Sequence, residues 1–412
     1  MRAYVEAYGC TLNFGEAREL EDTLLARGWE LAEDHEGADM SVLVTCVVVG
    51  KTERAMLKRI RALSGSPRLV VAGCMAAVSR ESAVRIAPDA EFVGPGDIAA
   101  FSRLVEDVGE ARARCAGAGT PYSIVPIATG CRGSCSYCLT RLARGALRSR
   151  PPERVVSHVA EAVSSGPREV QITSQDSACY GDDIGTDLPT LVHRICRLPS
   201  EFRLRIGMMN PRSVLPAVDR IADMYSEPKV FKFLHLPVQS ASDRLLEAMG
   251  RGYSMADYRR MVSAVRTRSP EASFSTDIIV GYPGETDEDH AANLRFIEEL
   301  APDIVNVTRF SPRPGTRAAE AGPKVGGQVT KERSREMTRL RFGVSLARNQ
   351  RWVGREVRAL ATERGKKRST VLRTDEYKQI VVPGELELGT FHELVVTRAT
   401  TNYLIGERRS SA

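Results

Sequence analysis

The sequence predicts an α/β protein made of an open α/β domain, a partial (β/α)6 barrel and a small C-terminal β-barrel. Strand-like apolar runs alternate with helical segments in the first hundred residues and again between residues 122 and 310, which is typical of parallel sheets. Beyond residue 356, short strands follow one another with turn signals between them, which favours a small barrel. Apolar residues make up 42% of the 412 residues and charged residues 27%, so the composition excludes a disordered chain and a coiled coil.

The first predicted domain, residues 1–110, contains three strands, and a cysteine follows each of them. Strands are expected at 3–8, 41–45 and 68–72, and helices at 16–27, 51–63 and 78–86. The cysteines are Cys10, Cys46 and Cys74. Because ligands gather beyond the carboxyl ends of strands in an open parallel sheet, we expect the three thiols to converge on one ligand. The alternative is three separate cysteines buried for structural reasons.

The second predicted domain, residues 122–345, follows a small, polar linker at 111–121 that contains Cys115. Six strands are expected, at 123–129, 169–173, 203–208, 232–236, 273–280 and 304–310. Helices are expected between them, at 152–164, 188–198, 242–249, 255–266 and 285–299. Six βα units in place of eight predict an incomplete barrel, whose site lies in the loops that follow its strands.

The last predicted domain, residues 346–408, follows a basic helix at 331–350. From residue 331 onward the chain carries 18 Lys and Arg against 10 Asp and Glu, whereas the first 330 residues carry 40 against 42. A basic module attached to a nearly neutral body predicts nucleic-acid binding. A solvated basic surface is the alternative.

The cysteine count points to metal or redox chemistry. Nine cysteines cannot all pair, which weakens a disulfide framework. Residues 1–9 form a strand-like run with two charges and do not resemble a secretion signal. No apolar run approaches the roughly 20 residues of a membrane span. We therefore expect a cytoplasmic protein without a membrane anchor, in a reducing compartment where disulfides are rare.

The most specific motif is Cys131-Arg-Gly-Ser-Cys135-Ser-Tyr-Cys138, directly after the first strand of the second domain. A structural zinc site needs four ligands, and no fourth Cys or His lies nearby in the sequence. A 4Fe-4S cluster held by three thiolates keeps one iron open for another ligand. The small residues Gly133 and Ser134 let the loop fold tightly. The spacing therefore favours an iron–sulfur cluster over structural zinc.

This C-x3-C-x2-C motif, with Tyr137 before its last cysteine, resembles that of the radical S-adenosylmethionine (SAM) enzymes. In that superfamily the open iron binds SAM, and reduction of the cluster cleaves SAM to a 5′-deoxyadenosyl radical. Stretches along the whole chain further resemble the methylthiotransferases of this superfamily. They are YGC (8–10), TCVVVGKTE (45–53), VAGCMA (71–76), ATGCRGSCSYCLTRLARGALRSRPPE (128–153), TSQDSACYGDDIGT (173–186), HLPVQSASD (235–243), MGRGY (249–253), STDIIVGYPGET (275–286) and FSPRPGT (310–316).

The resemblance implies a Rossmann-like N-terminal methylthiotransferase domain, a radical SAM core and a C-terminal TRAM domain, which is an RNA-binding β-barrel. It implies two 4Fe-4S clusters, one on Cys131, Cys135 and Cys138 and an auxiliary one on Cys10, Cys46 and Cys74. SAM would be both the methyl donor and the radical source. A sulfur source and a low-potential electron donor are further expected partners, and a monomer is the default expectation.

The loop SQDSACYG and the Gly133-Ser134 pair resemble the archaeal and eukaryotic subgroup. Its members methylthiolate carbon 2 of N6-threonylcarbamoyladenosine at position 37 of tRNA. Alternative substrates are isopentenyladenosine in tRNA and an aspartate of a ribosomal protein. Alternatives of another class are a two-cluster electron-transfer protein and a non-catalytic RNA-binding protein with iron–sulfur or zinc sites. Two departures from the family pattern, Val44 and Ala241, remove no ligand.

The remaining candidate residues follow predicted strands or lie in basic runs. For SAM they are Tyr137, Gln175, Asp176, Gln239, Ser240, Gly281 and Glu285, and the alternative for each loop residue is an ordinary loop cap. For tRNA phosphates they are Arg141, Arg144, Arg148 and Arg150, together with Arg364, Lys366, Lys367 and Arg368 in a turn of the last domain. His235, Cys179 and Cys196 are expected to be structural.

Overall fold

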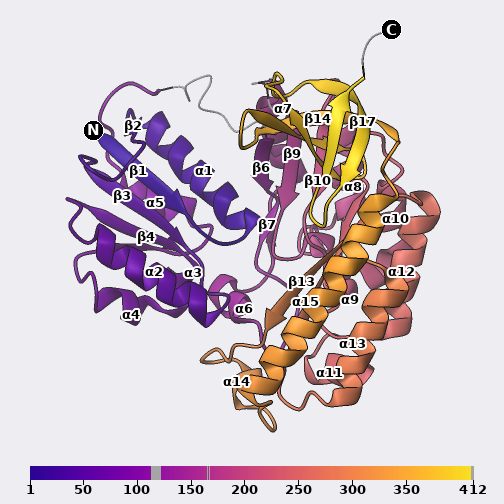
Figure 1. Cartoon of the computed structure of the whole chain (residues 1–412). Coiled ribbons are helices and arrows are strands. Elements are labelled where there is room, and N and C mark those ends of the chain that lie inside the picture. The colour runs from indigo at the N-terminus through magenta and orange to yellow at the C-terminus, as the bar shows by residue number, and fades with distance from the viewer. Residues whose placement is uncertain (113–121, 165, 167, 410–412) are drawn as a thin grey trace. The chain divides into compact units, whose positions relative to one another are not determined.

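The computed structural model describes residues 1–112, 122–164, 166 and 168–409 (Figure 1). The chain divides into two compact units. Unit 1 comprises Met1–Gly119, Thr129–Arg148 and Ser311–Ala319, and unit 2 comprises the rest. Residues 113–121 of the predicted linker, with Cys115, lie outside the described residues. Within the described residues, no helix is long and apolar enough to cross a membrane.

Unit 1 contains a five-stranded sheet in the order β2-β1-β3-β4-β5, in which all neighbours run parallel. Its strands are β1 (Arg2–Ala7), β2 (Glu30–Leu31), β3 (Met40–Thr45), β4 (Leu69–Gly73) and β5 (Glu91–Val93). The three central strands are the predicted ones. The edge strands β2 and β5 have two and three residues, which is too short to give a recognisable alternation.

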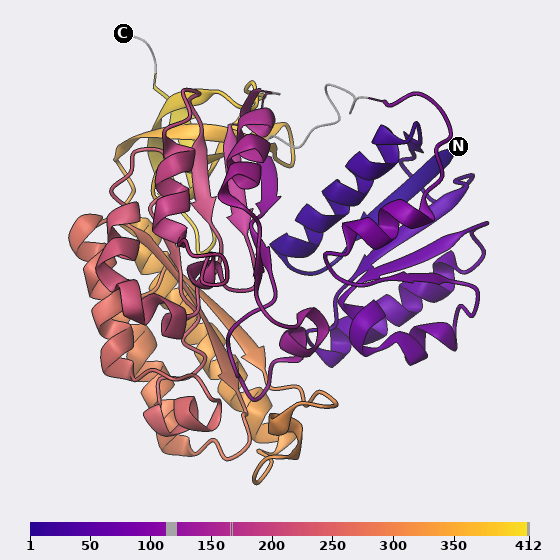
Figure 2. The same ribbon diagram turned by 180° about the vertical axis from the view of Figure 1, so that it is seen from behind.

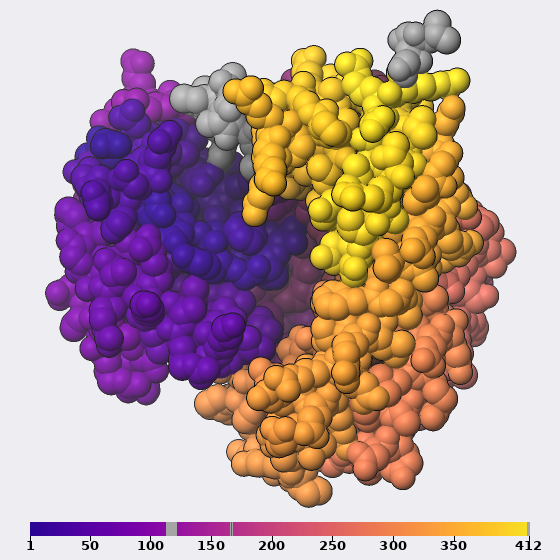
Figure 3. Space-filling model, viewed as in Figure 1, coloured from indigo at the N-terminus to yellow at the C-terminus, as the bar shows by residue number. Residues whose placement is uncertain are grey.

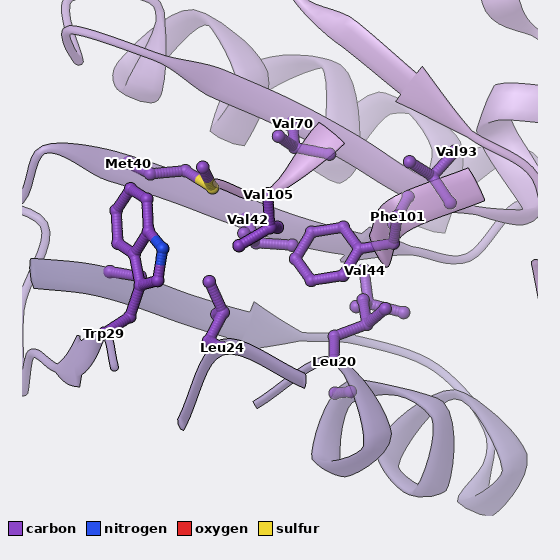
Figure 4. Close-up of a cluster of buried hydrophobic side chains, with 13 residues drawn as sticks. Leu20, Leu24, Trp29, Met40, Val42, Val44, Val70, Val93, Phe101 and Val105 are labelled. Atoms are coloured by element: carbon purple, nitrogen blue, oxygen red, sulfur yellow. The ribbon is translucent and has the colours of Figure 1, made fainter. Parts of the chain in front are cut away.

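Helices cover both faces of this sheet. On one face α1 (Thr11–Ala26) and α5 (Ile98–Leu104) enclose a fully buried core that includes Leu24, Trp29 and Phe101 (Figure 4). The other face is covered by α2 (Gly50–Leu63), α3 (Cys74–Val78) and α4 (Arg80–Val84). Val42 of β3 packs in the first core and Leu43 in the second, because successive side chains of a strand point to opposite faces.

The segment that carries the C-x3-C-x2-C motif belongs to unit 1. It runs from β7 (Ala128–Thr129) through the cysteine loop to α6 (Leu139–Arg144) and β8 (Arg148–Ser149). Leu139 and Ala143 of α6 are buried in the second core of unit 1, beside Met75 of α3. Apolar burial therefore fixes α6 against the helices that follow β3 and β4.

Unit 2 contains the six predicted strands as two parallel three-stranded sheets, β10-β9-β6 and β11-β12-β13. The strands are β6 (Tyr122–Pro126), β9 (Glu169–Thr173), β10 (Arg203–Ile206), β11 (Phe233–His235), β12 (Ser273–Val280) and β13 (Ile304–Arg309). Leu204 of β10 forms backbone hydrogen bonds with Lys229 and Phe231, just ahead of β11. The two sheets therefore follow one another as a partial barrel, and the predicted fold class is confirmed.

Helices lie on the outer side of these strands (Figure 2). The longer ones are α7 (Pro152–Ser164), α8 (Leu188–Cys196), α10 (Val218–Met224), α12 (Met255–Arg268) and α13 (Asp287–Leu300). The shorter ones are η1 (Ser177–Cys179), α9 (Pro211–Val214), η2 (Leu215–Ala217) and α11 (Asp243–Ala248), and α14 (Arg317–Glu320) crosses from unit 1 into unit 2. Tyr258 of α12 hydrogen-bonds Thr276 of β12, so alternate residues of β12 face this helix layer and the others face away from it.

A closed five-stranded barrel in the order β14-β15-β16-β18-β17 ends the chain. Its strands are β14 (Glu356–Arg364), β15 (Ser369–Thr374), β16 (Gln379–Pro383), β17 (Phe391–Ala399) and β18 (Leu404–Arg408). The barrel packs on the long helix α15 (Gly327–Gln350) (Figure 3). Asn349 of this helix donates to the carbonyls of Thr400 and Thr401. Trp352 lies in the barrel core.

The turn between β15 and β16 ties this barrel to the start of the parallel strands. Tyr377 of the turn packs with ring centroids 4.8 Å from both Phe231 and Phe233, and its hydroxyl donates to Glu169 at 3.1 Å. Asp375 accepts from Arg203 at 2.6 Å. Aromatic packing and hydrogen bonds therefore close the N-terminal end of β9, β10 and β11.

Asp303, just before β13, is a buried carboxylate that joins three parts of unit 2. It accepts from Lys378 of the barrel at 2.6 Å, from Arg348 of α15 at 3.1 Å and from the backbone of Phe274 in β12 at 2.8 Å. Burial favours the neutral acid, but Lys378 and Arg348 outweigh it and hold the pKa of Asp303 below its ordinary value.

We expect Asp303→Asn to lower the free energy of unfolding of unit 2 by about 3–5 kcal/mol at neutral pH, because two buried cations lose their partner. Urea unfolding followed by Trp352 fluorescence in a Trp29→Phe background would measure this. The lowered pKa stabilises the fold above the ordinary Asp pKa of about 3.9, so the difference between the two proteins should shrink as the pH falls below that value.

The matched control is Asp219→Asn, which removes an exposed carboxylate paired with Arg268. We expect a change within about 0.5 kcal/mol. An equal loss in both variants would contradict the role of Asp303.

Candidate functional site

The carboxyl ends of β1, β3 and β4 bring together the three cysteines of the first domain. Cys46 directly follows β3, Cys74 directly follows β4, and Cys10 is the residue before α1. Gly9 has a φ of +115°, and a Cβ there would lie 2.6 Å from the Cβ of Cys46. The loop after β1 therefore touches the loop after β3, and only glycine fits between them.

The electrostatics also reflect this proximity. Burial raises the pKa of the Cys46 thiol, and a negative charge on Cys10 raises it further. Burial raises the pKa of Cys74 to about 11; Arg144 opposes this shift, and Cys10 and Cys46 add to it. Burial therefore favours the neutral thiols, and a nearby cationic group such as a metal would favour their thiolates.

Asn13, a fully buried residue of α1, fixes the loops after β1 and β3 relative to each other. Its side-chain amide donates to the carbonyls of Tyr8 at 2.7 Å and Thr45 at 2.9 Å. Its side-chain oxygen lies 3.6 Å from the sulfur of Cys10, which donates to it. A single amide therefore sets the geometry of the first two cysteine loops.

Thr45 does the same for the loop after β4. Its hydroxyl donates to the carbonyl of Ala72 at 2.6 Å and accepts from the backbone N–H of Met75 at 3.2 Å. Ala72 and Met75 lie on either side of Cys74 in the sequence, so the two hydrogen bonds hold the backbone around this cysteine. The backbone of the third loop is thus fixed by the last residue of β3, one position before Cys46.

Arg144, the last residue of α6, reaches into the same place. It donates to both carboxylate oxygens of Glu16, at 2.5 and 2.9 Å, and to the side-chain oxygen of Asn13 at 2.8 Å. Burial disfavours its charge, but Glu16 outweighs this and raises the pKa of Arg144. Its buried Nε has no hydrogen-bond partner, although Cys74 and Cys10 lie close enough to interact with the guanidinium.

The second set of cysteines occupies the loop between β7 and α6. The N–H of Gly133 donates to the sulfur of Cys131 at 3.1 Å, and the N–H of Cys138 to the carbonyl of Cys135 at 3.3 Å. Burial raises the pKa of Cys138, and a charge on Cys135 raises it further. Amides directed at sulfur and sulfurs close enough to interact are what a thiolate-bound cluster requires.

Each set of three cysteines offers the sulfur donors that an iron–sulfur cluster binds. Within the described residues, no three His, Cys, Asp or Glu side chains are placed to hold one metal ion. In a 4Fe-4S cluster each thiolate binds a different iron, so the sulfurs surround a cube instead of one atom. The unpartnered Nε of Arg144 and the three cysteines beside it fit a sulfur-rich anionic group.

The loop after β9 contains Gln175 and Asp176. Asp176 is buried and accepts from the N–H of Asn210 at 2.9 Å, the hydroxyl of Ser213 at 2.7 Å and the N–H of Ala178 at 3.2 Å. Burial raises its pKa despite these donors. Its contacts join the loops after β9 and β10. The buried amide atoms of Gln175, by contrast, have no hydrogen-bond partner, which suits a bound ligand.

The other SAM candidates have mostly internal contacts. Gln239 has a φ of +71° and bonds through its backbone to β12, and Ser240 is fully buried. Glu285 forms a buried ion pair with Arg333 of α15 at 2.6 Å and accepts from the N–H of Gly281 at 2.9 Å. Tyr137 is partly buried beside Cys138. Glu285 and Gly281 therefore hold the loop after β12 to α15.

The basic residues that are candidates for tRNA contact differ in how exposed they are to solvent. Arg141 and Arg148 are exposed and Arg150 is partly buried, as RNA contact requires. Arg144 does not fit the predicted phosphate contact, because its guanidinium is buried against Glu16. The turn between β14 and β15 exposes Arg364, Lys366, Lys367 and Arg368. Lys367 and Arg368 have φ values of +55° and +54°, so the turn holds two cations in the left-handed region.

Sequence reasoning missed several residues that shape the sites. Asn13 and Glu16 follow Cys10 but lie outside every quoted stretch, and Thr45 lies in the stretch 45–53 without having been singled out. Polar residues on the side of the strands away from the helices were also missed. Asp277 of β12 accepts from His235 at 3.1 Å and from Asn306 of β13 at 2.6 Å. The alternation of polar and apolar residues along β12 and β13 is the signal that indicates them.

Comparisons with known proteins agree with this organisation. Residues 2–94 match the uncharacterized protein family UPF0004, residues 125–297 the radical SAM superfamily and residues 350–408 the TRAM domain. The chain is 38% identical to a probable threonylcarbamoyladenosine tRNA methylthiotransferase of Pyrococcus horikoshii, over 99% of both chains. It is 30% identical to the human threonylcarbamoyladenosine tRNA methylthiotransferase, over all of this chain and 74% of the human protein.

The fold resembles that of a solved radical SAM methyltransferase, TsrM from Kitasatospora setae. The TM-score is 0.58 at 16% identity, and the match covers 77% of this chain and 75% of that chain. At this identity the likeness supports the fold alone.

We expect Thr45→Val to loosen the loop that carries Cys74, because valine keeps the shape of threonine but removes both hydrogen bonds. The loss should lower the free energy of unfolding of unit 1 by about 1–3 kcal/mol. It should also speed alkylation of Cys74 in the metal-free protein, measured by peptide mass spectrometry.

The control is Thr362→Val, which removes a buried hydroxyl bonded to Val371 in the C-terminal barrel. This variant should leave the Cys74 alkylation rate unchanged. Equal alkylation rates in wild type and Thr45→Val would contradict the role of Thr45.

Proposed function

Because the chain belongs to the threonylcarbamoyladenosine tRNA methylthiotransferase family, we propose that it converts N6-threonylcarbamoyladenosine at position 37 of tRNA to its 2-methylthio derivative. Two sets of three cysteines within one compact unit carry this proposal. A radical enzyme that only cleaves SAM needs one such set. The second set supplies the site at which sulfur is held for transfer.

In this proposal each set holds its own 4Fe-4S cluster. Cys131, Cys135 and Cys138 hold the cluster with the open iron, and Gln175 and Gln239 remain the candidate SAM contacts of unit 2. Cys10, Cys46 and Cys74 hold the auxiliary cluster. When bound, SAM supplies a methyl group and, on reductive cleavage, a carbon radical, which an unactivated aromatic C–H bond requires.

The chain's own residues position these groups and keep two of the auxiliary thiols out of solvent, whereas Cys10 is exposed. Asn13 and Thr45 fix the auxiliary loops, and the buried thiols Cys46 and Cys74 lie away from solvent. His235, Asp277 and Asn306 form a hydrogen-bonded polar group on the face of the strands that points away from the helices. This group offers hydrogen bonds to the nucleobase of the substrate. The exposed cations of the β14–β15 turn attract tRNA phosphates.

The same proposal includes an electron donor, a sulfur source, a monomeric state and a cytoplasmic location. A low-potential electron donor reduces the clusters, and a separate sulfur source replenishes the sulfur that leaves with the product. The enzyme acts as a monomer in the cytoplasm, where tRNA is modified and thiols stay reduced.

We expect the anaerobically reconstituted protein to hold about eight irons. Cys131→Ala and Cys46→Ala should each hold about four, because each removes a ligand of one cluster only. Mass spectrometry of tRNA nucleosides should show the 2-methylthio product with wild type and with neither variant.

The control is Cys196→Ala, in a helix of unit 2, which should keep about eight irons and full activity. About four irons in wild type, unaffected by Cys46→Ala, would overturn the auxiliary cluster and with it methylthiolation. Methylthiolation of isopentenyladenosine, or of an aspartate in a ribosomal protein, would keep the chemistry and replace the substrate.

We expect Lys367→Gly combined with Arg368→Gly to weaken tRNA binding, since glycine suits the positive φ values while both charges are lost. The slope of log affinity against log salt should fall by about one for each lost phosphate contact. Affinity should fall alike for tRNAs of different sequence.

Filter binding at several salt concentrations would measure both quantities. Lys331→Ala with Arg335→Ala, two exposed cations on α15, is the matched control and should leave the slope unchanged. The same slope in wild type and in the turn variant would overturn RNA binding by this turn.

A further inference from the structure

We propose that Arg144 and Glu16 set the reduction potential of the auxiliary cluster, with Arg144 favouring the reduced cluster and Glu16 opposing it. The inference rests on the proposed function, because it needs a cluster on Cys10, Cys46 and Cys74. It assigns a role to two residues that lie outside the C-x3-C-x2-C motif and are not among the six cysteines.

Arg144 and Glu16 are two full charges that are buried away from water. The side chain of Arg144 is 0% exposed and that of Glu16 is 5% exposed. Two parallel hydrogen bonds join them, at 2.5 and 2.9 Å. Water does not screen charges buried in this way, so they act strongly on any neighbouring charge.

Arg144 lies beside the cysteines of the auxiliary set. Asn13 accepts from Arg144 at 2.8 Å, and the same oxygen lies 3.6 Å from the sulfur of Cys10. The guanidinium also lies close enough to Cys74 and Cys10 to interact with them. Two of the guanidinium nitrogens are satisfied by Glu16 and Asn13, and the buried Nε has no partner. One N–H thus remains for a sulfur.

The two buried charges have opposite signs and therefore opposite effects on the potential of a cluster. A 4Fe-4S cluster with thiolate ligands is anionic and gains one more negative charge on reduction. Its potential depends on net charge, on hydrogen bonds to sulfur and on solvent exposure. A buried cation at the sulfurs therefore raises the potential, and the carboxylate that neutralises it lowers the potential.

Arginine is needed at position 144 for its shape as well as its charge. The planar guanidinium binds Glu16 with two parallel hydrogen bonds and still reaches Asn13, which the point charge of lysine cannot do. Arg144 ends the helix that begins after Cys138. The same side chain therefore fixes the loop of the other cysteine set against α1, so it is a positioning residue for both sets.

The test is a redox titration followed by electron paramagnetic resonance in a Cys131→Ala background, in which only the auxiliary cluster is bound. Arg144→Gln should lower the potential, whereas Glu16→Gln should raise it. The double variant should lie between the two. Arg144→Lys should restore part of the shift because it keeps the charge. Arg348→Gln, which breaks the buried pair with Asp303 in unit 2, should leave the potential unchanged.

Opposite shifts from the two single variants support the proposal, since general loosening of the fold would move both in one direction. Shifts in the same direction, or no shift at about four irons, would overturn the role of the pair and leave the proposed function intact. If Arg144→Gln loses its iron, Glu16→Gln alone decides, and a lowered or unchanged potential overturns the proposal. No iron in the Cys131→Ala protein would overturn both this inference and the auxiliary cluster.

Discussion

Parallel pairing of β1, β3 and β4 is the constraint on which the cysteine site depends. Because neighbouring strands run in the same direction, their carboxyl ends meet, and residues 10, 46 and 74 come together without being close in sequence. An antiparallel β3 would carry Cys46 to the far edge of the sheet. The apolar cores on both faces fix this pairing, since a slip of one residue would turn Val42 and Leu43 to the wrong sides.

The loops beyond these strands are held by polar groups that are themselves buried. Asn13 and Thr45 satisfy backbone groups of three loops, and each would be costly to leave unpaired. Arg144 adds a buried charge, which is tolerated because Glu16 lies against it. The same ion pair attaches the C-x3-C-x2-C segment to α1, so the fold of unit 1 links the two cysteine sets through one side chain.

Local pattern predicted most of the strands and helices, because these depend on short-range features of the chain. Strand alternation and the spacing of Cys131, Cys135 and Cys138 are visible within a few residues. The short edge strands β2 and β5 are not, since their pairing comes from the sheet and not from their own residues. The division of the six strands of unit 2 into two three-stranded sheets, linked at Leu204, also could not be predicted from single strands. It depends on how the strands pack together in the folded protein.

Charge was the least reliable guide, as Arg141 and Arg144 illustrate. Both belong to one basic run and both suggested phosphate contact, yet α6 buries Ala143 and Arg144 and leaves Arg141 in solvent. Glu285 and Asp176 similarly satisfy internal donors. A charged residue in a loop has two physical uses, to bind a ligand or to balance a buried partner. The partner lies far away in sequence: Glu16 is 128 residues from Arg144. Only the fold shows whether such a residue binds a ligand or balances a buried charge. Arg144 does both in our proposal, because it pairs with the buried Glu16 and lies beside the cysteine sulfurs.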